Sequence, residues 1–97
     1  MRRVFAQVEK AQYILLEKIG VTRFDERLRR SREMALKLFE KIWGMAMQRG
    51  IVESEEDAAI LYLHCFSHVL SARGIAVPSD ALPENKEIQK FAKEVLT

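Results

Sequence analysis

The sequence has little of what disulfide-stapled, membrane-spanning or strand-rich proteins need. Its one cysteine, Cys65, cannot form a disulfide within the chain. The two prolines and four glycines lie between stretches of regular apolar spacing, which favours a few long helices over many short strands. No uninterrupted apolar run reaches the ~20 residues of a membrane span. The longest candidate, 58–70, is interrupted by His64, Ser67 and His68.

An excess of charge of one sign is also lacking. The formal net charge is +2 over 97 residues, so the whole chain has no strong attraction to nucleic acid or anionic lipid. With 48% hydrophobic and 31% charged residues, the composition is that of a globular protein. The two arginines near the start are followed by Gln7, Glu9 and Lys10 instead of the apolar core of a secretory signal. We therefore expect one cytoplasmic domain over residues 1–97.

What the sequence does contain is apolar residues at helical spacing in four segments. The expected fold is all-α, a four-helix bundle or array with a long second helix and a central, apolar third helix. The predicted helices span about 3–19, 23–49, 55–73 and 83–96. Gly20, Gly50 and Gly74 follow the first three, where a left-handed residue commonly ends a helix.

Polar residues mark the predicted helix starts. Thr22 is the expected N-cap of the second helix, and Ser54, followed by acidic residues, is the expected N-cap of the third. Pro83 suits the first turn of the fourth helix.

The second helix has more apolar residues than one interface needs. A heptad-like seam is formed by Phe24, Leu28, Ser31, Ala35, Leu38, Ile42 and Met45, and a second stripe beside it by Leu36, Phe39, Trp43 and Met47. The third helix is apolar on most sides. We therefore expect a protein-interaction module, a homodimer or a small subunit of a complex, with contacts through helices two and three. The candidate interface residues are Trp43, Met45, Met47, His64 and His68. In the alternative interpretation the other helices cover this surface.

Arginines crowd the start of the second helix, at Arg23, Arg27, Arg29, Arg30 and Arg32. Cations are unfavourable at the positive end of a helix. Arg23, Arg27 and Arg30 share a face and suggest an alternative function, the binding of nucleic acid or another anion. The competing interpretation is a solvated face on which Asp25, Glu26 and Glu33 pair with the arginines.

The two histidines, His64 and His68, are spaced to share a metal ion on one helix face. A metal site needs further ligands from another helix, and no second cluster of ligating residues is evident, so we expect no metal or cofactor. An exposed polar strip, or a pH-sensitive contact, is the simpler interpretation. No nucleophile motif or phosphate-binding glycine loop occurs, and we expect no enzyme activity.

Overall fold

The computed structural model describes residues 2–23 and 25–96, with residues 2–6 described by their backbone alone. It contains four α-helices and one short 3-10 helix, and no strand occurs in the described part of the chain. The elements are α1 (Arg2–Lys18), α2 (Glu26–Gln48), α3 (Glu55–Ala72), η1 (Ser79–Ala81) and α4 (Lys86–Leu96). The all-α fold class is confirmed, and α2 is the longest helix.

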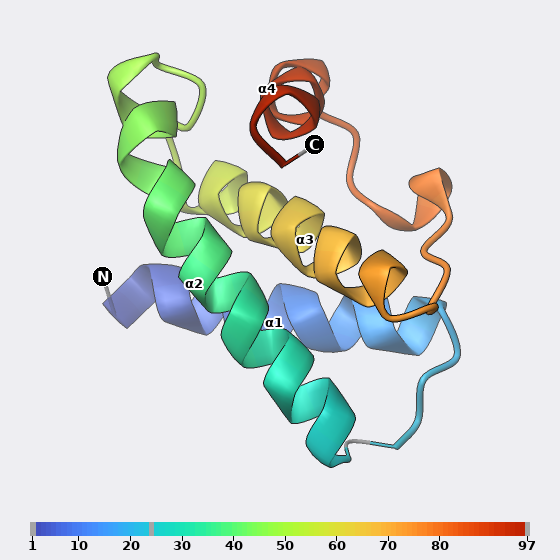
Figure 1. Ribbon diagram of the computed structural model, residues 1–97. Coiled ribbons are helices and arrows are strands. Elements are labelled where there is room, and N and C mark those ends of the chain that lie inside the picture. The colour runs from blue at the N-terminus through green and yellow to red at the C-terminus, as the bar shows by residue number, and fades with distance from the viewer. Residues whose placement is uncertain (1, 24, 97) are drawn as a thin grey trace.

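Helix α3 is the centre of the molecule, because α1, α2 and α4 each pack against it. Figure 1 shows α1 passing behind α3, with α2 and α4 on other sides of it. Nine of its eighteen residues are buried, and at about 100° per residue they cover an arc of roughly 200°, more than half of the helix circumference. The buried residues are Ala58, Ala59, Leu61, Tyr62, Leu63, Cys65, Phe66, Val69 and Leu70. The predicted central apolar third helix is therefore confirmed.

The helix ends after α1, α2 and α3 follow the predicted glycine chemistry. Gly20, Gly50 and Gly74 have φ of +77°, +69° and +85°, which is backbone that other residues rarely adopt. After Gly74, the amide of Ile75 donates to the carbonyl of Leu70 at 2.9 Å. This bond satisfies a carbonyl that the end of the helix leaves without a partner.

The start of α2 differs from the prediction. Asp25 is the N-cap, and its carboxylate accepts from the amide of Leu28 at 3.0 Å. The expectation that Thr22 caps a helix beginning at residue 23 is wrong. A carboxylate at the positive end of a helix adds charge stabilisation to the capping hydrogen bond, which a threonine hydroxyl does not supply. As a result, Arg23 lies in the segment connecting α1 and α2.

The other two helix starts also depend on polar caps. The Ser54 hydroxyl accepts from the amide of Asp57 at 3.1 Å, as predicted for α3. The carboxylate of Asp57 in turn accepts from the amide of residue 53, just before the cap, which adds a second hydrogen bond to the helix start. Helix α4 begins later than predicted, because the Asn85 side chain accepts from the amide of Ile88 at 3.1 Å. Pro83 therefore precedes the helix.

The register of α2 also differs from the heptad prediction. Its buried residues are Leu28, Ser31, Ala35, Phe39, Ile42 and Ala46. From the first to the last there are 18 steps along the chain (46 − 28) in about five turns, which is the 3.6-residue period of a straight helix. A 3.5-residue seam drifts by about 20° per heptad on such a helix. Leu38 is consequently half-buried and Met45 exposed, although both were predicted to lie in the seam. Phe24, predicted to begin the seam, lies outside the described residues.

Candidate functional sites on helix α2

Two of the five clustered arginines belong to an ion-pair network along the exposed side of α2. Arg29 lies 2.6 Å from Glu26 and 3.7 Å from Glu33, and Arg30 lies 3.6 Å from Glu26. Hydrogen bonding to Arg29 lowers the pKa of Glu26, and the same bond raises the pKa of Arg29. Because all four side chains are exposed, these pairs contribute little to stability. For Arg29 and Arg30, the structure favours the interpretation as a solvated face.

Arg32 has a different role. Its guanidinium lies 3.4 Å from the Glu9 carboxylate on α1, and the arginine is half-buried. The ion pair therefore joins α2 to α1. Arg32 serves the packing of the fold and leaves little of its guanidinium for a ligand.

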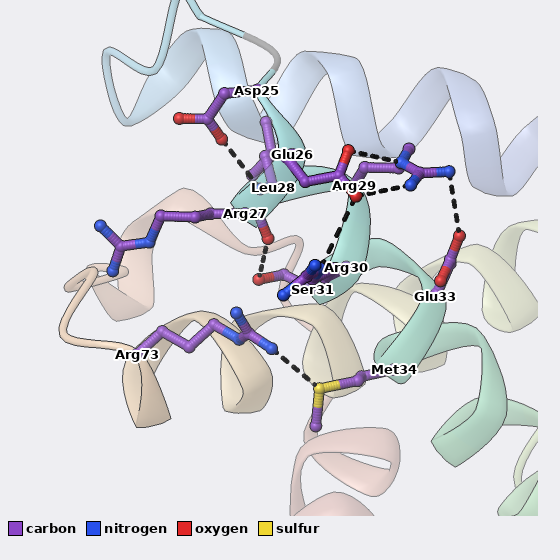
Figure 2. Close-up of polar contacts among 10 residues, drawn as sticks. All are labelled: Asp25, Glu26, Arg27, Leu28, Arg29, Arg30, Ser31, Glu33, Met34 and Arg73. Atoms are coloured by element: carbon purple, nitrogen blue, oxygen red, sulfur yellow. Dashed lines mark hydrogen bonds and ion pairs between the residues drawn. The ribbon is translucent and has the colours of Figure 1, made fainter.

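Arg23 and Arg27 have no ion-paired carboxylate among the residues that the structure describes. Both line a hollow of about 370 Å³ between the α1–α2 connection and the end of α3. Arg73, the residue after α3, lines the same hollow. Figure 2 shows the Arg27 side chain extending away from the network of Arg29. We call this site the arginine hollow. Its other lining residues are Val21, Asp25, Leu28, Ser31, Gly74 and Ile75.

The arginine hollow corrects the grouping made from the sequence. Arg23 and Arg27 do come together, whereas Arg30 is absent from the hollow and pairs with Glu26. Arg73 was missed because it is 46 residues from Arg27 in the chain (73 − 27 = 46). It reaches the site because the end of α3 lies beside the start of α2. Its guanidinium also donates to the Met34 sulfur at 3.1 Å, as Figure 2 shows.

The predicted interface residues do not share one face of α2. Successive residues on a helix are turned by about 100°, so Met45 and Met47 lie on roughly opposite sides. They are 40% and 52% exposed. Trp43 lies near the side of Met47, is half-buried, and packs against Phe39 with 5.2 Å between ring centroids. The indole is therefore partly used by the core of this chain.

Met34, Leu38 and Met45 lie on the same side of α2, and we call them the methionine flank. Met34 is 48% exposed, and Leu38 is half-buried between the two methionines. The flank is the direct result of the 3.6-residue core register, which turns these positions out of the interface with α3. Basic side chains border it on the solvent side, at Arg30, Lys37 and Lys41, all exposed.

The two histidines of α3 differ in their surroundings. His68 is exposed, whereas His64 is half-buried and lines a hollow of about 440 Å³ together with residues 79, 80, 82–84 and 89. The Nε2 atom of His64 is buried and has no hydrogen-bond partner among the described residues. Burial lowers the pKa of His64. No group of three histidine, cysteine, aspartate or glutamate residues in the described ranges could hold a metal ion.

No protein-family model, curated protein or solved structure matches this chain. The geometry of its own side chains is therefore the basis for assigning a function. Within the described part of the chain, no helix has the length and apolar character to cross a bilayer.

Proposed function

We propose that this chain is a cytoplasmic protein-interaction module, a small subunit of a complex, that docks its partner on the methionine flank. The observation that carries the proposal is the 48% and 40% exposure of Met34 and Met45 on one side of α2. Every large apolar side chain of α3 is at least half-buried, so α3 has none to spare. Flexible, polarizable methionines adapt to varied apolar surfaces, and exposed apolar patches mark interaction sites.

The charges beside the flank indicate what kind of partner fits. Lys37 and Lys41 are exposed on its border and have no acidic partner among the described residues. An antiparallel pair of α2 helices joined symmetrically through the flank would bring the two basic rows together. Such like-charge contact opposes self-association. The flank instead fits an apolar surface that is edged with carboxylates, such as an amphipathic acidic helix.

A defined probe tests this preference. Two synthetic amphipathic helices of equal length, one of leucine and glutamate and one of leucine and lysine, are titrated into protein labelled with ¹³C at the methionine methyl groups. The acidic peptide should shift the methyl signals of Met34 and Met45 and leave that of Met47, on the opposite side, unchanged. Met45→Glu should abolish binding, and Met47→Glu, two residues away on the same helix, is the matched control.

Equal binding of the two peptides, or shifts at Met47 as large as those at Met45, would contradict the proposal. Sedimentation of the unmodified chain supplies the second check, and we expect the 11.3 kDa monomer. A dimer that Met45→Glu dissociates would assign the flank to a second copy of the chain, the other form of the interaction-module hypothesis.

A further inference from the structure

We infer that the arginine hollow binds the phosphate group of a small organic ligand. Three arginines from three parts of the fold line this site. Arg23 comes from the α1–α2 connection, Arg27 from the first turn of α2, and Arg73 from the end of α3. This inference concerns a different chemical class of ligand from that of the methionine flank, and the two sites meet where Arg73 contacts Met34.

The pairing of the other arginines makes these three distinctive. Arg29, Arg30 and Arg32 each have a carboxylate within 2.6–3.7 Å. Among the described residues Arg23, Arg27 and Arg73 have none, although they line one hollow. Three cations lining one site repel each other, and the positive end of α2 adds to the repulsion experienced by Arg27. A bound anion would remove this repulsion.

One acidic residue, Asp25, also lines the hollow, and it does not neutralise the site. Three arginines and one aspartate leave a formal charge of +2 (3 − 1). The Oδ1 atom of Asp25 already accepts the capping hydrogen bond from Leu28. The remaining charge matches a phosphate monoester, which carries between one and two negative charges near pH 7.

The shape and walls of the hollow favour an organic phosphate over the bare ion. Its volume of about 370 Å³ falls in the range of small-molecule sites, roughly 300–1,000 Å³. Val21, Leu28 and Ile75 supply apolar wall, and Gly74 has no side chain to fill the space. The planar guanidinium forks can each donate two hydrogen bonds to phosphate oxygens. The apolar wall would then contact the organic part of the ligand.

A nucleic-acid backbone fits this surface less well than a single phosphate. A strand needs a track of available cations along its phosphates. Next to the hollow, however, Arg29 and Arg30 are already paired with Glu26, and Glu33 continues the acidic side of the network. The carboxylates would repel a second and third phosphate.

The test compares phenyl phosphate with inorganic phosphate by ¹H–¹⁵N NMR titration at constant ionic strength. Phenyl phosphate should bind more tightly, with shifts at residues 21–31 and 73–75. Arg27→Gln and Arg73→Gln should each weaken binding at least about tenfold, because each removes charge-assisted hydrogen bonds. Arg30→Gln is the matched control, since it removes the same charge from the same helix outside the hollow, and it should change the affinity less than about twofold.

Several results would overturn the inference. One is a response to phenyl phosphate no larger than that to sodium chloride at the same ionic strength. Another is an equal loss of binding in Arg30→Gln and Arg27→Gln. A twelve-nucleotide single strand that binds more tightly than phenyl phosphate, with a steep salt dependence, would replace the small ligand by nucleic acid.

Arg23→Gln serves as a further test of the hollow if Arg73→Gln alters the fold. Met45→Glu should leave phosphate binding unchanged, which separates this site from the proposed docking surface.

Discussion

The hydroxyl of Tyr62 on α3 donates a 2.5 Å hydrogen bond to Oε1 of Gln12 on α1, and both side chains are fully buried. Aromatic rings enclose the pair. Phe39 meets the Tyr62 ring edge-on at 6.0 Å, and Phe66 stacks on it at 5.9 Å. Burial raises the pKa of Tyr62, which keeps the hydroxyl protonated as a donor. This polar link therefore fixes the position of α1 against the central helix within a mostly apolar core.

Breaking this link from one side should be costly. Tyr62→Phe leaves Oε1 of Gln12 without a partner, and Gln12→Leu leaves the Tyr62 hydroxyl without one. Each should lower the free energy of unfolding by about 1–3 kcal/mol. The double variant removes both polar groups, including the Gln12 Nε2 atom, which has no partner in the described structure. Its loss should be smaller than the sum of the single losses. Urea unfolding followed by circular dichroism measures all four proteins, and simple additivity would contradict the coupling.

The lone cysteine should be unreactive in the folded chain. Cys65 is fully buried on α3, and burial raises the pKa of its thiol to about 12. The thiolate needed for reaction is therefore scarce, and reagent reaches it only through opening of the fold. A typical free energy of unfolding keeps the open population below about one in a thousand. Ellman's reagent at pH 8 should react with Cys65 at least about a thousandfold more slowly in buffer than in denaturant.

A matched thiol on the same helix controls for the reagent. Ser71 is exposed near the end of α3, so Ser71→Cys in a Cys65→Ala background should react at the rate of an unprotected thiol. Rapid labelling of native Cys65 would show that α3 is not covered by the other helices as the structure describes.

Local chemistry made the ends of α1, α2 and α3 and the start of α3 predictable, whereas the starts of α2 and α4 and the packing of α2 were harder to predict. A glycine after a helix, or a serine before an acidic first turn, affects the helix end only through residues close to it in the sequence. Gly50 and Ser54 were therefore assigned correctly. Predicting which residues of α2 are buried required a choice between an apolar repeat of 3.5 and one of 3.6 residues per turn. The two repeats differ by less than one residue over two turns. That small difference decides whether Phe39 or Leu38 is buried, and therefore which residues remain for a partner.

The candidate sites depended still more on packing. Gln12 follows Val8 by four residues and precedes Leu15 by three, so its place on the buried face of α1 could have been inferred from spacing alone. Arg73 had no comparable signal, because only the antiparallel return of α3 along α2 brings it to Arg27.

Two glycines of similar exposure should respond oppositely to alanine. Gly50 follows α2 with φ +69°, and an alanine there should cost about 1–2 kcal/mol of folding free energy. Gly44 lies inside α2, does not have a positive φ, and has nothing within 4 Å of an added Cβ. Gly44→Ala should stabilise the chain by about 0.5–1 kcal/mol, because alanine loses less backbone entropy in a helix. Thermal and urea unfolding of the two variants give the comparison, and destabilisation by Gly44→Ala would contradict it.

The stability of the fold should fall in mildly acidic solution because of His64. Burial lowers its pKa below the ordinary value of 6.5, so the folded state favours the neutral imidazole. Between that lowered pKa and the unfolded value of about 6.5, the unfolded chain binds more protons than the folded chain. The stability that His64 contributes is therefore fully present above the pKa of the unfolded state. It is lost as the pH falls through the lower pKa of the folded state.

Asp80 and Glu84 line the same hollow as His64. Neither carboxylate offsets the lowering of the His64 pKa by burial. Urea unfolding at pH 7.5 and at pH 5.5 spans the upper part of the window before most carboxylates titrate. His64→Gln should lose less stability than the unmodified chain over this interval, because glutamine stays neutral throughout. His68→Gln, one turn further along α3 and exposed, should retain the pH dependence of the unmodified chain. If both variants instead show the same dependence of unfolding free energy on pH as the unmodified chain, His64 is not the group that is protonated on unfolding. Replacing that group would have removed the proton uptake.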